Sequence, residues 1–160
     1  MRRVALIEDQ ALVRGGIRAL LALSDAVQVV AEGSDGEDVP AIATEHRPEV
    51  YLIDIRMPRV DGIEAIRRLR ANGDSTPAII LTTFDDHRLV LEGIEAGAQG
   101  YLLKDVSLDV LIDAIERVCC GETMLRPAIT ETVIESLSRR SADFEASDAP
   151  EPLSPRELEV

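Results

Sequence analysis

Five short apolar runs alternate with helix-like stretches, and this alternation is the strongest constraint on how the chain can fold. The third run, residues 50–53, has no polar residue to turn toward water, which is typical of a strand covered on both faces. Strands that alternate with helices form parallel sheets through βαβ units. The sequence therefore predicts an α/β fold with a doubly wound, five-stranded parallel sheet. The five runs cover residues 4–7, 27–31, 50–53, 78–81 and 101–103.

The stretches between the runs carry apolar residues at helical spacing and polar residues suited to helix ends. Ser34 and Glu37 have the spacing of a capping box, Gly97 suits a left-handed C-cap, and Ser107 suits an N-cap. These signals place helices between successive strands. The clearest apolar stripe, after the fifth run, is Leu108, Leu111, Ile112, Ile115 and Val118.

Polar and charged side chains gather where the predicted strands end. Because the carboxyl ends of parallel strands meet at one edge of a sheet, we expect these side chains to lie together. Two carboxylates about 5 Å apart repel by roughly 3 kcal/mol at an effective dielectric constant of 20, so a cluster of three needs a cation. The set is Glu8 and Asp9 after the first run, Asp54 after the third, Thr82 and Thr83 at the fourth, and Lys104 after the fifth.

Carboxylate oxygens and a lysine at one rim indicate Mg²⁺-assisted phosphoryl chemistry. Mg²⁺ prefers hard oxygen ligands and is commonly bound by one or two carboxylates together with phosphate oxygens. In that reading Asp54 is the nucleophile, Lys104 neutralises charge on the phosphoryl oxygens, and Thr82 bonds one of them. The plainer alternative is that Asp54 only caps a turn after its strand.

Composition narrows the partners and the compartment. The formal net charge of −13 argues against a nucleic-acid surface within these 160 residues. No apolar run approaches the roughly 20 residues of a membrane span, and the N-terminus turns acidic too early for a signal peptide. We therefore expect a cytoplasmic protein with no membrane partner. Cys119 and Cys120 are adjacent and are expected to be free thiols.

The sequence after the fifth βα unit consists of three segments of different composition. Residues 1–121 form the expected first domain, and residues 122–140 are expected to form a linker helix beginning near Pro127. Residues 141–152 have the composition of a flexible linker. Residues 153–160, LSPRELEV, have the signals that start a helix but too few residues to complete one. We therefore expect the chain to be a fragment of a longer protein.

Taken together, these motifs resemble the receiver domain of a two-component response regulator. The resemblance covers residues 1–121 and includes Asp61 with Gly62 as well as the strand-end residues. It implies a flavodoxin-like, CheY-like fold in which Asp54 is the phosphoacceptor and Mg²⁺ is the cofactor. The roles it implies are the metal ligands Glu8, Asp9, Asp54 and the backbone carbonyl of Arg56, the phosphate partners Thr82, Thr83 and Lys104, and the switch residues Thr82 and Tyr101.

Two short segments have sequences similar to those of the NarL or LuxR-type subfamily. These segments are LTTFDD at residues 81–86 and GYLLKD at residues 100–105, and LSPRELEV resembles the start of that subfamily's helix-turn-helix domain. The resemblance implies a sensor histidine kinase as donor, a homodimer on phosphorylation, and DNA binding only through a C-terminal domain outside these residues. We also expect Tyr101 to turn inward when Thr82 moves. One departure is Asp105, where many receivers have a cis proline.

Of three alternative functions, two require residues that this sequence lacks. A phosphohydrolase of the haloacid-dehalogenase kind needs a second aspartate two residues after its nucleophile, where this chain has Arg56. A flavodoxin-like FMN carrier needs a glycine- and hydroxyl-rich loop after the first strand, where Glu8 and Asp9 would repel phosphate. A stand-alone receiver that relays phosphate without DNA output is the closest rival.

Overall fold

The computed structural model describes residues 1–83 and 89–125, which belong to one compact unit running from Met1 to Arg126. The linker at residues 141–152 and the helix start at residues 153–160 lie outside the described residues, as does the linker helix beyond residue 125. Those domain boundaries therefore stay predictions. None of the helices in the described part of the chain is long and apolar enough to cross a membrane.

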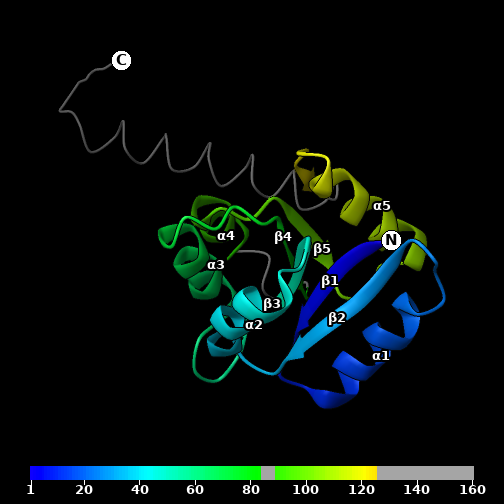
Figure 1. Ribbon diagram of the computed structural model, residues 1–160, viewed down its shortest axis with the longest axis horizontal. Helices are drawn as coiled ribbons and strands as arrows, with labels where there is room; N and C mark the ends of the chain where they lie inside the picture. Colours follow the sequence, from blue (N-terminus) through cyan, green and yellow to red (C-terminus); the bar gives the residue numbers. More distant parts are fainter. Residues whose placement is uncertain (84–88, 126–160) are drawn as a thin grey trace, which may run out of the picture. The chain divides into compact units, whose positions relative to one another are not determined.

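The described residues form a parallel sheet with helices on both faces (Figure 1). The strands are β1 (Arg2–Ile7), β2 (Val27–Gly33), β3 (Val50–Asp54), β4 (Ala78–Thr82), β5 (Gly100–Leu103) and β6 (Met124–Leu125). The helices are α1 (Ala11–Leu21), α2 (Val39–His46), α3 (Gly62–Ala71), α4 (Val90–Ala96) and α5 (Leu108–Cys119), with a 3-10 turn η1 at Gly36–Asp38.

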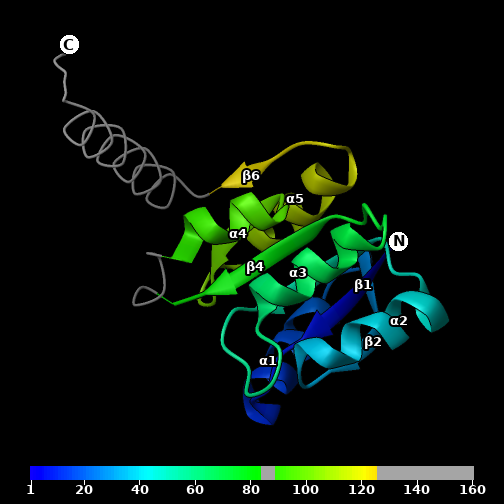
Figure 2. The same ribbon diagram turned by 90° about the vertical axis from the view of Figure 1, so that its left-hand side faces the viewer.

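The strand order is β2-β1-β3-β4-β5-β6, which confirms the five predicted strands and the doubly wound, CheY-like fold. The sheet also has a short sixth strand, because β6 pairs in parallel with β5 through Met124 opposite Gly100 and Leu125 opposite Tyr101. Helices α1 and α5 cover one face, and α2, α3 and α4 cover the other (Figures 1 and 2). This order places β1, β3, β4 and β5 side by side with their carboxyl ends at one rim.

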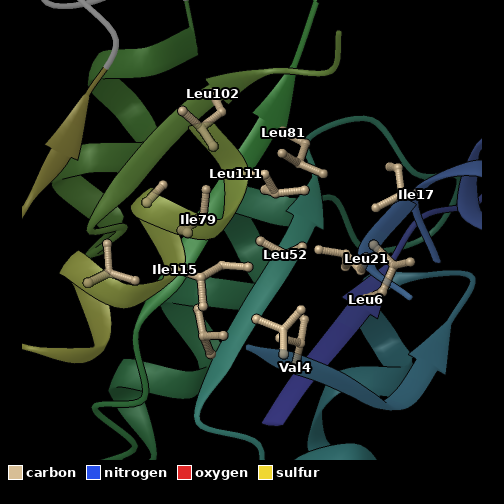
Figure 3. Packing of buried hydrophobic residues seen from close by; sticks show 14 residues of the cluster. Val4, Leu6, Ile17, Leu21, Leu52, Ile79, Leu81, Leu102, Leu111 and Ile115 are labelled. Carbon is tan, nitrogen blue, oxygen red and sulfur yellow. The ribbon is translucent and has the colours of Figure 1, made fainter. Parts of the chain in front are cut away.

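One part of the core lies between the sheet and helices α1 and α5 (Figure 3). Alternate residues of the central strands point to this face, and Leu111 and Ile115 of α5 pack against them. Burying each such side chain contributes roughly 1.5–3 kcal/mol before the entropy of ordering it is counted. The sheet side chains in this core are Val4, Leu6, Val27, Val50, Leu52, Ile79, Leu81 and Leu102.

The helix ends test the capping predictions. Gly97 ends α4 in the left-handed region with φ of 112°, and the Ser107 hydroxyl accepts the Val110 N–H at 3.3 Å, as predicted. The capping box predicted for Ser34 and Glu37 is wrong by one residue. Asp35 and Asp38 form it instead, because the Asp38 carboxylate accepts the backbone N–H groups of residues 34 and 35.

Two smaller expectations have clear outcomes. Cys119 and Cys120 are free thiols at the C-terminal end of α5, as predicted. Among the described residues every peptide bond is trans, including the bond between Lys104 and Asp105. The replacement of proline by Asp105 therefore goes with ordinary backbone geometry after β5.

Candidate functional site

The carboxylates of Glu8, Asp9 and Asp54 lie together at the carboxyl rim of the sheet. One oxygen from each lies within 4.8 Å of the others. β1 and β3 are neighbours in register, with Ile7 opposite Ile53, so the residues that follow them meet across the two strands. Glu8 and Asp54 are only 1% and 5% exposed, whereas Asp9 is not buried. The structure thus brings together the three acidic residues that the sequence singled out.

Lys104 joins this cluster from the far side of β4. Its Nζ lies 3.0 Å from Glu8 Oε1 and 3.1 Å from Asp54 Oδ1, so one ammonium contacts both buried carboxylates. The backbone N–H of Lys104 donates to the Thr82 carbonyl at 2.8 Å, which fixes where β5 ends relative to β4. The lysine therefore supplies the cation that two buried carboxylates need.

The pKa values of these groups reflect burial and proximity. Burial raises the pKa of the Glu8 and Asp54 carboxyls above their ordinary values, and Lys104 only partly offsets this effect. Burial alone would lower the pKa of Lys104, but the two carboxylates raise it overall. Three carboxylates facing one ammonium leave an excess of negative charge. The site is therefore suited to a further cation.

The donor set fits Mg²⁺. The three groups offer hard oxygen atoms, and octahedral Mg²⁺ binds such atoms at about 2.0–2.1 Å, so that opposite ligands lie about 4.2 Å apart. A spread within 4.8 Å needs only small side-chain adjustments to match that geometry. Glu8, Asp9 and Asp54 are the residues that would hold the ion. Arg56 lies two residues after Asp54, before α3, and the role of its backbone carbonyl stays a prediction.

The two threonines stand beside the cluster. Thr82 is the last residue of β4 and is fully buried, and its hydroxyl donates to the Thr83 carbonyl at 3.2 Å. Thr83 is exposed. Both residues line a shallow cleft with Leu103, Lys104 and Asp105. Lys104, which lines this cleft, is also the residue that contacts Asp54 and Glu8.

Tyr101 lies on the α4 face of the sheet and is fully buried. Its hydroxyl donates to the Leu89 carbonyl at 3.4 Å, and burial raises its pKa well above the ordinary value. In this structure the Tyr101 ring already points inward, and Gly93 of α4 leaves room for it, because a β-carbon there would overlap the tyrosine hydroxyl. A movement of Tyr101 coupled to Thr82 stays a prediction.

The contact between Gly93 and Tyr101 was not visible in the sequence. Gly93 sits inside a helical stretch where glycine is normally unfavourable by about 1 kcal/mol relative to alanine. A glycine inside a helix suggests a packing reason, but its partner on β5 becomes known only from the structure.

We expect Gly93→Ala to lower the free energy of unfolding by about 1–3 kcal/mol, because the added methyl group overpacks the space that holds the Tyr101 ring. Urea denaturation measures this loss, and ultraviolet titration of the phenol in a Tyr51→Phe background shows whether Tyr101 becomes exposed. Gly16→Ala on α1 is the matched control, since its β-carbon meets nothing within 4 Å and should stabilise the helix. A Gly93→Ala variant with the parent's stability and tyrosine titration would contradict the assignment.

Comparison with known proteins agrees with this geometry. Residues 4–116 match the family described as response regulator receiver domain. The chain is 42% identical over 158 residues to the uncharacterized transcriptional regulatory protein YxjL of Bacillus subtilis, covering 99% of this chain and 72% of that protein. Further relatives are covered over 58% to 75% of their lengths.

Solved structures give the same result. A two-component response regulator of the LuxR family from Aurantimonas superposes with a TM-score of 0.79 at 30% identity, over 86% of this chain and 99% of that one. The receiver domain of the putative response regulator NarL from Mycobacterium tuberculosis superposes with a TM-score of 0.71 at 31% identity, over 76% and 98% of the two chains. The chain therefore belongs to the family of response regulator receiver domains, of the NarL/LuxR type.

Proposed function

We propose that Asp54 of this receiver domain accepts a phosphoryl group from a sensor histidine kinase in a reaction that depends on Mg²⁺. The observation that carries the proposal is the position of Lys104 Nζ, 3.0–3.1 Å from both Glu8 and Asp54, inside a cluster of three carboxylates. Burying such a cluster of carboxylates costs free energy of folding unless cations neutralise the charges, and groups of this kind often mark functional sites. Phosphoryl transfer gives each carboxylate and the lysine a role.

Each residue of the site has a separate role in this reaction. An Asp54 carboxylate oxygen attacks phosphorus, a P–O bond forms, and the bond from phosphorus to the donor's histidine nitrogen breaks. Glu8, Asp9, Asp54 and the Arg56 carbonyl would hold Mg²⁺, which when bound offsets charge on the phosphoryl oxygens. Lys104, directly after β5, would contact one of these oxygens, and the Thr82 and Thr83 side of the cleft would supply hydrogen-bond donors.

The group accepted by Asp54 is later lost to water, so the domain acts on its own side chain and not on a separate substrate. This is the behaviour of a signalling domain. We propose that the output is transcription regulation by a C-terminal LuxR-type DNA-binding domain that residues 153–160 begin. The names of its relatives as transcriptional regulators favour this output over a stand-alone phosphate relay.

The first prediction concerns the acceptor. Acetyl phosphate with Mg²⁺ should add one phosphoryl group to the chain, seen as a gain of about 80 Da by intact mass, through covalent transfer to a carboxylate. The gain should disappear when EDTA removes the metal, because the ion must offset the charge of the cluster. Asp54→Asn is the control, and an equal gain in that variant would show that the acceptor is a different residue.

The second prediction concerns the metal. Asp9→Ala should weaken Mg²⁺ binding by more than about tenfold in calorimetric titration, since even outer-shell groups cost 10–100-fold when lost. Asp25→Ala removes the same charge from an exposed position outside the cluster and should leave the affinity close to that of the parent. Equal affinities in the two variants would remove Asp9 from the metal site.

The third prediction concerns association. A phosphoryl group offers new acceptors to Thr82 and Lys104, and the Tyr101 hydroxyl already connects β5 to the start of α4 through Leu89. We therefore expect phosphorylation to stabilise the buried position of Tyr101 and to fix the surface formed by α4, β5 and α5. Moving a two-state population from 1:99 to 99:1 needs about 5.5 kcal/mol, which a few charge-assisted hydrogen bonds can supply.

Light scattering with and without beryllofluoride should show a shift from monomer to symmetric homodimer. Thr82→Ala should reduce this shift while leaving Mg²⁺ binding intact, because Thr82 is placed in the cleft and not among the metal ligands. A chain that is equally dimeric in every state would break the proposed connection between the phosphoryl group and this surface. A chain that stays monomeric in every state would place the dimer contacts elsewhere in the protein.

A further inference from the structure

We propose that Asp35 is a positioning residue for the metal site, acting through the backbone of the loop that connects β3 to α3. Asp35 lies in the turn between β2 and η1 and belongs to neither the acidic cluster nor the cleft. The inference rests on the proposed function, because it concerns how the Arg56 carbonyl is held toward Mg²⁺. It assigns a role to a residue that is not a ligand.

The Asp35 carboxylate binds two segments of backbone at once. Its Oδ2 accepts the Arg59 N–H at 2.9 Å, and its Oδ1 accepts the Val60 N–H at 2.9 Å and the Glu37 N–H at 3.0 Å. The side chain is only 7% exposed, which makes it one of the few buried acidic groups in the described part of the chain. One buried carboxylate therefore satisfies three backbone donors, two of them in the loop after β3.

These contacts make the loop a segment with two anchors. Near Asp54, the Gly62 N–H donates to the Ile55 carbonyl at 2.9 Å and closes the loop onto the start of α3. At the far side, residues 59 and 60 are held by Asp35. Arg56 lies between these anchors in sequence. Fixing both ends limits the directions in which its carbonyl can point.

Gly36 brings the two loops into direct contact. Its backbone N–H donates to the Val60 carbonyl at 3.0 Å, and a β-carbon at this position would overlap the same carbonyl group. The close approach therefore requires glycine. Asp35 and Gly36 together fix the loop by two independent means, a charge-assisted acceptor and a short distance between backbones.

The chemistry of the carboxylate explains why Asp35 cannot be replaced by its amide. Burial by itself would raise the pKa of Asp35, but the backbone donors of Glu37, Arg59 and Val60 lower it overall, so the group accepts as an anion. An asparagine has one oxygen and one amide nitrogen. In Asp35→Asn an N–H of the loop or the turn must face an NH₂ group, and at least one anchor is lost.

The experiment measures Mg²⁺ binding in the 160-residue chain with Asp35→Asn, Gly36→Ala and the matched control Glu37→Gln. Glu37→Gln removes the same charge from the same turn and breaks an exposed ion pair with Arg59, but it keeps the backbone N–H that Asp35 accepts. We expect Asp35→Asn to raise the Mg²⁺ dissociation constant about tenfold, the lower end of the loss typical for groups that orient a ligand. The control should stay within about twofold.

A kinetic readout separates positioning from general damage. The Mg²⁺ concentration that half-saturates phosphorylation by acetyl phosphate should rise with the dissociation constant in Asp35→Asn, while the rate at saturating Mg²⁺ stays within about twofold of the parent's. Gly36→Ala should also raise the Mg²⁺ dissociation constant and the half-saturating Mg²⁺ concentration. It replaces Asp35→Asn in the test if that variant does not unfold cooperatively.

The measurements distinguish a failure of the positioning role from a failure of the proposed function. Folded variants with the parent's Mg²⁺ affinity, even at a lower melting temperature, would overturn the positioning role and leave the proposed function untouched. A parent chain that binds no Mg²⁺, or that is phosphorylated equally well in Asp54→Asn, would overturn the proposed function itself.

Discussion

The contact of one lysine with two buried carboxylates determines how the rest of the rim is arranged. Glu8 and Asp54 are almost completely buried, and burying ionised carboxylates without a partner costs several kcal/mol each. Lys104 can reach both because β1, β3, β4 and β5 lie in that order and end at the same edge. The strand order of the sheet therefore determines which charged groups meet at the site.

Much of this arrangement could be predicted from the sequence. The five strands were predictable because each is an apolar run, and polar residues at their ends must meet at one rim in a parallel sheet. The short strand β6 was not, since Met124 and Leu125 form no run and their strand exists only by pairing with β5. The capping box was misplaced because Ser34 and Asp35 are both good caps, and the backbone donors that Asp35 accepts, from Glu37, Arg59 and Val60, are known only from the structure.

The position of Tyr101 shows the limit of such reasoning most clearly. A tyrosine in a strand can adopt more than one side-chain rotamer, and the sequence predicted only that the Tyr101 ring can turn inward when Thr82 moves. The position of the ring depends on contacts with another part of the chain, because Gly93 of α4 leaves room for the hydroxyl and the Leu89 carbonyl accepts a hydrogen bond from it. A propensity or a period along the chain carries no information on a contact of this kind.

The same strand connects the charged rim to the buried tyrosine. Lys104 directly follows β5, and Tyr101 lies within β5 three residues earlier. Neutralising or phosphorylating Asp54 changes the charge that Lys104 faces, so the ammonium must redistribute its contacts among Glu8, Asp54 and any new oxygen. The backbone N–H of Lys104 is bonded to the Thr82 carbonyl, which ties this redistribution to the end of β4 as well. A change of charge at the rim therefore acts on β4 and β5 together, the two strands that carry Thr82 and Tyr101.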